Sequence, residues 1–239
     1  MRKVLVDFTK RRIFKFKCSP DVGLQLVRDF FCNKRNGYFV DLGANDPFLD
    51  SQSFHLESLG WDGLLIEPLP EYVDQLKEKR RGRVVQCACS NPANHNVVHK
   101  MIVAGVHSTL NNNPIALGAV KEKTIDVTCR TLDSILYDCG APIGFDLLSI
   151  DVEGHEMEVF QGFDLLKWKP KLVLLEDHVI NHQKHKYMIS HGYQILLRTG
   201  LNSWYVPRNM GYRLSLMSRI EYLRKYWFGL IFRKLKYAK

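Results

Sequence analysis

The amino-acid sequence predicts an α/β fold: a mainly parallel sheet with an antiparallel pair of strands at one edge and helices on both faces. Short apolar runs alternate with helical patterns along the chain, as in strands joined by crossover helices. Two runs end at Asp41 and Asp151, each with a glycine close behind, which is typical of parallel strands opening onto a ligand crevice. With 239 residues, 46% of them hydrophobic, the chain can form one substantial core, and no second domain is required.

The elements follow one another in a regular order. A basic segment, residues 1–35, includes a helix over 21–32 with apolar side chains on one side. Strands are expected near residues 38–42, 63–67, 84–89, 96–103, 124–128, 145–151, 171–176, 193–198 and 203–207. Helices are expected near 51–59, 70–80, 131–138, 155–160 and 183–191, bounded by glycine and proline. We assign the main domain to 36–210 and a basic, aromatic tail to 211–239.

The turn after the first strand indicates a nucleoside site. Gly43 permits close approach of the backbone, whereas Asn45 and Pro47 break the Gly-x-Gly-x-x-Gly spacing that holds a pyrophosphate. Glu67 ends the next strand, where an acidic group accepts hydrogen bonds from ribose hydroxyls. The combination indicates S-adenosylmethionine, a cationic nucleoside without phosphates. Taken singly, Gly43 is also compatible with a plain turn, and Glu67 with a solvated charge at the end of a strand.

Acidic and histidine side chains gather after the strand at 145–151. Asp151, Glu153, His155 and Glu156 follow one another closely, and a helix starting near residue 154 would favour a neutral imidazole at His155. Transfer of a methyl group to a hydroxyl, which the family resemblance described below implies, calls for a general base or a metal ion, because a hydroxyl is a weak nucleophile near neutral pH. We therefore expect Asp151 and His155 to be catalytic and Glu153 to contact the substrate.

The strand at 171–176 ends at the same edge of the sheet with Glu176, Asp177 and His178. Asp151 with Glu176 or Asp177 offers oxygen ligands for Mg²⁺ or Mn²⁺, and His178 is a further catalytic candidate. The alternative is that these carboxylates cap helices or pair with basic residues, and that the histidines are ordinary residues near helix starts.

Two further segments are candidates for substrate contacts. Residues 104–123 lack periodicity and are rich in Asn, Gly and Ser, so that His107 and Ser108 lie on a loop long enough to be a lid or a plain surface loop. Trp204 and Tyr205 lie on the last strand, where an aromatic face stacks on a sugar ring or packs in the core.

The cysteines and the apolar runs of the sequence indicate the cellular compartment of the protein. The six cysteines are Cys18, Cys32, Cys87, Cys89, Cys129 and Cys139, without a Cys-x-x-Cys pair. Reduced thiols, with Cys87 and Cys89 buried on one face of a strand, are favoured over zinc ligands. No apolar run reaches about 18 residues and the start does not resemble a secretory signal. We expect a cytoplasmic protein.

The net charge of +9 is concentrated in the two ends of the chain. Residues 1–17 hold seven basic residues against one acidic, and residues 213–239 hold eight against one, so the remainder is negative. Apolar residues from Leu216 to Ile231 recur at helical spacing among the basic groups. Such a helix is typical of a peripheral contact with an anionic membrane on its cytoplasmic face; packing on the protein's own body or in a homodimer is the alternative.

Four segments resemble the FkbM-type methyltransferases, a branch of the class I, Rossmann-like S-adenosylmethionine-dependent enzymes. They read Val40-Asp-Leu-Gly-Ala-Asn45, Ile66-Glu-Pro68, Thr131-Leu-Asp133 and Leu148-Ser-Ile-Asp-Val-Glu-Gly-His-Glu156, and the resemblance covers roughly residues 36–207. It implies O-methylation, often of sugars or secondary metabolites. A glycine common in the family shortly after Asn45 is absent here, where Asp46-Pro47-Phe48 follow.

The resemblance also implies a cofactor site. Asp41, Gly43, Ala44 and Asn45 would line the methionine end, Glu67 the ribose, and residues 88–90 the adenine. The full set expected to bind the cofactor is Asp41, Gly43, Ala44, Asn45, Ser53, Glu67, Pro68, Ala88, Cys89, Ser90 and Asp151.

We expect the acceptor to be a saccharide, in a cell-surface glycan or lipid-linked, or a small-molecule hydroxyl. A nucleic-acid methyltransferase is disfavoured, since Asp151-Val-Glu-Gly places carboxylates where a stacked base would lie, and a nicotinamide enzyme is disfavoured by the missing glycines. A non-catalytic membrane-surface module on a methyltransferase-like fold is a further alternative, distinguished by whether the chain binds S-adenosylmethionine.

Overall fold

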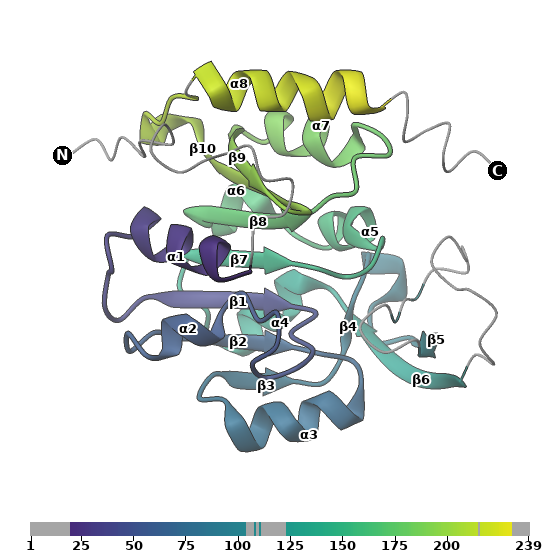
Figure 1. Ribbon diagram of the computed structural model, residues 1–239. Helices are drawn as coiled ribbons and strands as arrows, with labels where there is room; N and C mark the ends of the chain where they lie inside the picture. Colours follow the sequence, from purple (N-terminus) through teal and green to yellow (C-terminus); the bar gives the residue numbers. More distant parts are fainter. Residues whose placement is uncertain (1–19, 104–107, 109, 111–122, 215, 231–239) are drawn as a thin grey trace.

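The computed structural model describes residues 20–103, 108, 110, 123–214 and 216–230, and a seven-stranded sheet forms its centre (Figure 1). The strand order is β3-β2-β1-β7-β8-β10-β9. The strands are β1 (Tyr38–Leu42), β2 (Asp62–Ile66), β3 (Arg83–Val85), β7 (Leu147–Ile150), β8 (Leu172–Glu176), β9 (Tyr193–Thr199) and β10 (Asn202–Pro207).

Strand direction confirms the predicted sheet. The pairs β3/β2, β2/β1, β1/β7 and β7/β8 are parallel, whereas β10 is antiparallel to both β8 and β9. From β1 the chain first builds outward through β2 and β3, and later returns to place β7 on the other side of β1. The fold is therefore Rossmann-like, with its topological switch point between β1 and β7, where ligands bind in such sheets.

A second, three-stranded sheet replaces part of the predicted pattern. It has the order β4-β6-β5 and consists of β4 (Ala88–Cys89), β5 (Val98–Val103) and β6 (Lys123–Arg130). The single strand predicted over 84–89 is wrong, because the main-sheet strand ends at Val85 and the chain crosses to pair Ala88 with Cys129. This crossing brings Ala88 and Cys89 to the carboxyl edge of the main sheet.

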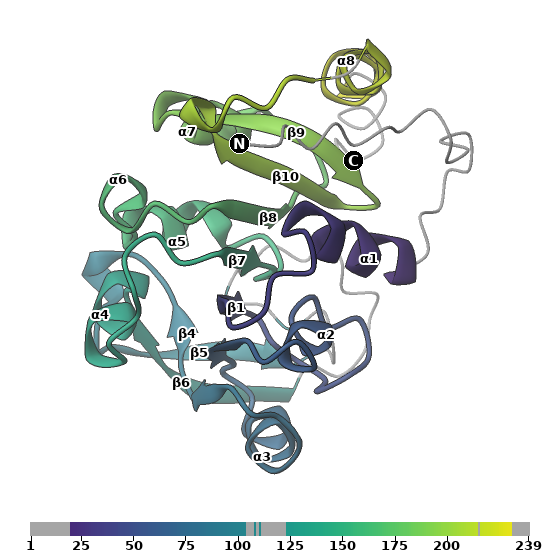
Figure 2. The ribbon, with the colours of Figure 1, turned by 90° about the vertical axis from the view of Figure 1, so that its left-hand side faces the viewer.

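Helices cover both faces of the main sheet, as predicted (Figure 2). They are α1 (Pro20–Phe30), α2 (Phe54–Glu57), α3 (Pro70–Lys79), α4 (Leu132–Asp138), α5 (Glu156–Gln161), α6 (Leu165–Trp168), α7 (Gln183–Ser190) and α8 (Leu216–Leu223), which continues as a π-helical turn (Arg224–Phe228). Short 3₁₀ turns occupy Pro92–Asn94 and Arg208–Met210. The predicted helix over 51–59 is reduced to α2, and α6 was not predicted.

Strand alternation divides the core into two layers. Val40 and Leu42 belong to a cluster that α4, α5 and α7 cover, whereas Phe39 belongs to one that α1 and α2 cover. The five described cysteines are free, and Cys87 and Cys89 are buried as predicted. Within the described residues, no helix combines the length and the apolar character needed to cross a membrane.

Candidate functional site

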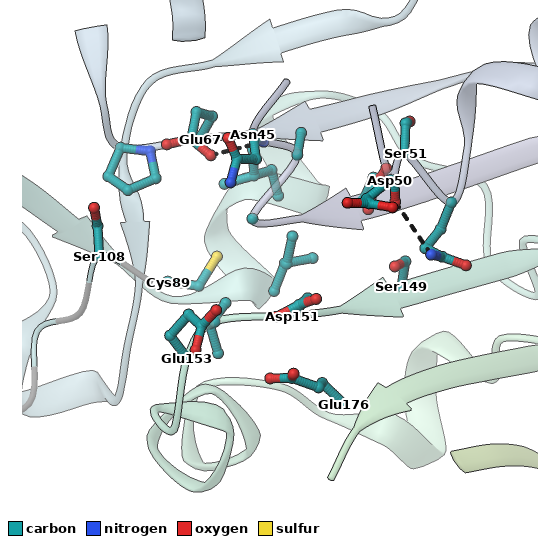
Figure 3. Close-up of a pocket in the computed structure, with 18 of the residues that line it drawn as sticks. Asn45, Asp50, Ser51, Glu67, Cys89, Ser108, Ser149, Asp151, Glu153 and Glu176 are labelled. Carbon is teal, nitrogen blue, oxygen red and sulfur yellow. Dashed lines mark hydrogen bonds between the residues drawn. The ribbon is translucent and has the colours of Figure 1, made fainter. Parts of the chain in front are cut away.

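A cavity of about 470 Å³ lies at the carboxyl ends of β1, β2, β7 and β8, at the switch point of the sheet (Figure 3). Its size is within the range of small-molecule sites, which is about 300 to 1,000 Å³. The predicted site residues that line it are Asp41, Gly43, Ala44, Asn45, Glu67, Pro68, Ala88, Cys89, Ser108, Asp151, Glu153, His155 and Glu176. Most of the residues that the sequence predicted for the site therefore line this one cavity.

The turn after β1 is shaped by its contact with the end of β7. Gly43 has a positive φ of 75°, and a Cβ there would overlap the carbonyl oxygen of Asp151. Glycine is thus required here for two reasons: it adopts the positive φ without strain, and it lets the ends of β1 and β7 approach closely. Asp41, just before it, is buried and accepts a hydrogen bond of 2.5 Å from the Ser53 hydroxyl. Ser53 is fully buried and outside the cavity lining, so it orients Asp41 and the expected cofactor contact is wrong for this side chain.

Arg80, at the end of α3, holds the segment in which this chain departs from the family pattern. Its buried guanidinium donates to the carbonyl of Pro47 at 3.1 Å and to the hydroxyls of Ser51 and Ser53 at 3.2 and 2.9 Å. It also forms a 3.1 Å ion pair with buried Glu57. The proline-containing turn is therefore fixed from behind by one planar, multidentate donor.

Glu67 and Asn45 form one end of the cavity (Figure 3). The Glu67 carboxylate accepts hydrogen bonds from the backbone N–H groups of Asn45 and Leu69, at 3.0 and 2.9 Å. Burial nevertheless raises the pKa of Glu67 to about 7. Asn45 has a φ of 47°, and its side-chain oxygen has no hydrogen-bond partner among the described residues. Leu69, Met101 and Leu110, with Ala88 and Cys89, supply an apolar wall at the cavity.

Three carboxylates, Asp151, Glu153 and Glu176, gather farther along the cavity from Glu67 (Figure 3). One oxygen from each lies within 4.8 Å of the others. Asp151 is open to the cavity, but the enclosing walls raise its pKa well above the ordinary value, and the charges of Glu176 and Glu153 add to this. Burial alone would raise the pKa of Glu176, but the interactions with His178, Asp151 and Lys184 together lower it. Of these two carboxyl groups, Asp151 therefore holds a proton more readily.

Lys184 of α7 supports this acidic group from behind. Its ammonium forms a 2.7 Å ion pair with the fully buried Glu156 and donates to the backbone carbonyl of Glu176 at 2.9 Å. Glu156 in turn accepts from the backbone N–H of Gly154 at 3.1 Å, next to Glu153, whose φ is 50°. A strained non-glycine residue of this kind is characteristic of functional turns.

The two histidines predicted to be catalytic occupy different environments. The Ser90 hydroxyl accepts a hydrogen bond from the Asn94 amide at 2.9 Å and lies 2.9 Å from Nε2 of His155, so it fixes the orientation of the imidazole ring. Burial lowers the pKa of His155. Ser90 is fully buried outside the cavity lining, so it supports His155 instead of contacting a ligand.

His178 lies outside the cavity lining, and its Nε2 is 3.4 Å from Glu176. The interaction with that carboxylate raises the pKa of His178. His178 therefore pairs with Glu176 outside the cavity lining, and its catalytic role stays a prediction. His107 lies outside the described residues, whereas Ser108 lines the cavity.

Three other predictions are corrected by burial. Asp177 accepts from the Val179 N–H at 2.8 Å and from the Tyr226 hydroxyl at 3.1 Å, away from the cavity, so Glu153 and not Asp177 completes the acidic group. Trp204 and Tyr205 are 1% and 0% exposed, in opposite core layers. Neither ring has a face on which a sugar could stack.

The β9–β10 hairpin and the segment before α2 contribute cavity residues that were not predicted. Thr199, Gly200, Leu201 and Asn202 line the cavity because Asn202 pairs with Glu176 in the sheet. Asp50, Ser51 and Gln52 add further polar groups. The Thr-Gly-Leu-Asn turn between two expected antiparallel strands was the available signal: a hairpin beside β8 must turn at the edge where β8 ends.

The fold and the cavity together define a Rossmann-like protein with a ligand site at the switch point. The chain belongs to the FkbM methyltransferase family, since a model of the Methyltransferase FkbM domain matches residues 41–214. The resemblance seen in the sequence is therefore confirmed.

Solved structures with low sequence identity are similar to this chain. Methyltransferase FkbM from Methylobacillus flagellatus KT has 18% identity and a TM-score of 0.46, covering 79% of this chain and 50% of that one. Precorrin-6y C5,15-methyltransferase from Geobacter metallireducens GS-15 has 14% identity and a TM-score of 0.43, covering 78% of this chain and 84% of that one. The chain thus spans half the length of the Methylobacillus protein. No curated protein sequence matches it significantly.

Proposed function

We propose that this chain is an S-adenosylmethionine-dependent O-methyltransferase whose acceptor is a hydroxyl group, most simply that of a saccharide. One observation carries the proposal: a single cavity at the switch point joins a set of nucleoside-type acceptors at Glu67 and Asn45 to the carboxylates of Asp151 and Glu176. A cationic cofactor would lie along this cavity with its charge next to the acidic group.

The residues at the Glu67 end fit the cofactor. Glu67 has lone pairs left for the ribose hydroxyls, and the unpartnered oxygen of Asn45 suits an ammonium or hydroxyl donor. The turn at Gly43 and Ala44 lines the same cavity. Ala88, Cys89 and Met101 offer apolar surface for an adenine ring. This cofactor carries no phosphate, in agreement with the absence of the Gly-x-Gly-x-x-Gly spacing from the sequence.

The acidic end fits removal of a hydroxyl proton. When bound, S-adenosylmethionine supplies a methyl group whose bond to sulfur breaks as the bond to the acceptor oxygen forms. The pKa of Asp151 is raised in the empty cavity, and the positive charge of the cofactor would favour ionisation of Asp151 and Glu176. The ionised pair can hold the acceptor by hydrogen bonds and take its proton. Lys184 and His178 keep Glu176 in place for this role.

The same carboxylates suit a hard divalent cation. Asp151, Glu153 and Glu176 are the residues that would hold Mg²⁺ or Mn²⁺, and an oxygen-only donor set is the one these ions prefer. A bound ion would lower the pKa of a coordinated hydroxyl. The proposal of methyl transfer does not depend on the metal, because the carboxylate pair alone can accept the proton.

The acceptor side of the cavity is polar. Asp50, Gln52, Thr199 and Asn202 offer hydrogen-bonding groups beside the acidic residues, which suits a sugar or a polyhydroxylated secondary metabolite better than a nucleic acid, whose phosphates the carboxylates would repel. We place the reaction in the cytoplasm, in keeping with the free state of the described cysteines.

Calorimetry with S-adenosylmethionine, followed by transfer of labelled methyl to a panel of lipid-linked and nucleotide-linked sugars, tests the proposal. We expect binding, an O-methylated product, and a loss of at least about 100-fold in turnover for Asp151→Asn. Asp126→Asn, the same change at an exposed residue outside the cavity lining, should leave turnover intact. No heat of binding would refute the cofactor, methylation at nitrogen would refute the acceptor class, and full activity in chelator would refute the metal.

A further inference from the structure

The C-terminal helical segment, α8 with its π-helical turn, has one face held firmly against the protein body. Tyr226 is 1% exposed, and its hydroxyl donates to Asp177 at 3.1 Å and lies 2.8 Å from the Ser203 hydroxyl. One turn earlier, the Tyr222 hydroxyl lies 2.9 Å from Nε2 of His185. These polar and aromatic contacts fix which way the segment faces, so its other side points away from the sheet (Figure 1).

The outward face of this segment is apolar. Its large side chains are exposed to the following extents: Leu216 72%, Ile220 51%, Leu223 48%, Trp227 56% and Phe228 69%. The first four follow one another at intervals of four, three and four residues, which places them in one stripe along the helix. A surface helix of a globular protein normally exposes polar residues instead, and a contiguous apolar stripe of this kind marks an interaction surface.

Basic residues accompany the stripe. Arg219 and Arg224 are exposed on the same segment, and residues 213–239 hold eight basic residues against a single acidic one. Aliphatic and aromatic side chains flanked by arginines are suited to the boundary between acyl chains and anionic headgroups. A symmetric contact with a second copy would instead bring the like charges of Arg219 and Arg224 of the two chains together.

We propose that the outward face of α8 and its π-helical turn docks the protein on an anionic lipid surface, with Leu216, Ile220, Leu223, Trp227 and Phe228 entering the headgroup boundary. The inward tyrosines stay in the core, so docking needs no rearrangement of the fold. The segment is anchored through Asp177 directly after Glu176, so the lipid surface and the cavity are linked by adjacent residues of β8 and its loop. The inference does not depend on the reaction proposed above.

The test is co-sedimentation of the full chain with phosphatidylcholine vesicles, with and without phosphatidylglycerol. We expect binding to the anionic vesicles that weakens with salt, and a drop of at least about tenfold for the variant Ile220→Ser/Leu223→Ser/Trp227→Ser. A matched control, Val98→Ser/Ile143→Ser/Leu166→Ser, removes apolar groups of similar exposure elsewhere and should bind like the wild type. Arg219→Glu/Arg224→Glu, which leaves the apolar stripe intact, should also weaken binding.

Tryptophan fluorescence gives an independent measurement on the wild-type chain. Of the four tryptophans, Trp61, Trp168 and Trp204 are at most 3% exposed, so that lipid contact with Trp227 alone can shift the emission to the blue and protect it from aqueous quenchers. Vesicle binding without this change would mean that other basic segments bind the lipid, and would overturn the proposal. So would equal binding by the triple variant, or a lipid-free dimer that the triple variant abolishes.

Discussion

The carbonyl oxygen of Asp151 lies in the space that a Cβ of residue 43 would occupy, so that Gly43 is the point at which the ends of β1 and β7 meet. This contact joins two segments more than a hundred residues apart and sets the distance between the nucleoside end and the acidic end of the cavity. The site is therefore sensitive to a single methyl group at this position.

Gly43→Ala should disrupt both folding and cofactor binding. The new Cβ meets backbone, which cannot move aside without separating the strands, and the positive φ adds about 1 kcal/mol of strain. Gly140→Ala is the matched control, since Gly140 has a φ of 67° but nothing within 4 Å of its Cβ. Urea unfolding and calorimetry should show only the strain cost at residue 140 and a larger loss at residue 43. Equal costs at the two positions would contradict the proposed overlap.

Glu67 predicts a pH dependence of cofactor affinity. Burial raises its pKa to about 7, and the ionised form is the one that accepts ribose hydroxyls best. Affinity for S-adenosylmethionine should therefore fall as pH drops through 7, approaching tenfold for each unit below it. Glu67→Gln should bind more weakly and remove this dependence. A wild-type profile that the glutamine variant reproduces would assign the titration to another group.

In the unliganded protein, the contribution of Glu67 to folding stability should depend on pH in the opposite direction. A folded-state pKa raised from 4.5 to about 7 means that the contribution of Glu67 to stability is complete below pH 4.5 and is lost as pH rises through 7. Subtracting the unfolding free energies of Glu67→Gln from those of the wild type across this range isolates the effect. A difference that grows with pH would reverse the assignment.

Much of this architecture could be predicted from local pattern. Asp41, Glu67 and Asp151 were placed at one edge because parallel strands end together, and the structure confirms that they line one cavity. The parts that were missed depend on contacts distant in sequence. Nothing near Arg80 or Lys184 in the sequence reveals that Arg80 binds the turn at Pro47 or that Lys184 pairs with buried Glu156.

The strand at 84–89 shows a related limit. Its apolar pattern is continuous in sequence, and only the competing partner β6 draws Ala88 and Cys89 away from the main sheet. Trp204 and Tyr205 show a second limit of sequence pattern. Alternation predicts that neighbouring residues on a strand face opposite sides of the sheet, but it does not predict that both sides of this strand are buried.

Lys184→Met should be strongly destabilising. Glu156 is fully buried and Lys184 is its ion-pair partner at 2.7 Å, so the change leaves an unpaired buried carboxylate, at a cost of about 3 kcal/mol or more. Lys100→Met removes an ion pair whose members are 75% and 64% exposed and should cost less than about 1 kcal/mol. Adding Glu156→Gln to Lys184→Met should recover part of the loss. Additive costs in this double-mutant cycle would show that the pair is not coupled.

Variants of Asp151 and Asp177 distinguish a catalytic role from a structural one. Both residues were predicted as metal ligands, but of the two only Asp151 lines the cavity. Asp177→Asn should lower the unfolding free energy by about 1 to 2 kcal/mol, because the Tyr226 hydroxyl loses a charged acceptor. Its turnover should remain measurable at temperatures where it is folded. Asp151→Asn should do the reverse: turnover is lost while stability is unchanged or higher, since an amide relieves the repulsion that Glu176 and Glu153 exert on an ionised Asp151. Denaturant unfolding and initial rates on both variants decide the matter, and an Asp177→Asn protein that is stable but inactive would return Asp177 to the reaction.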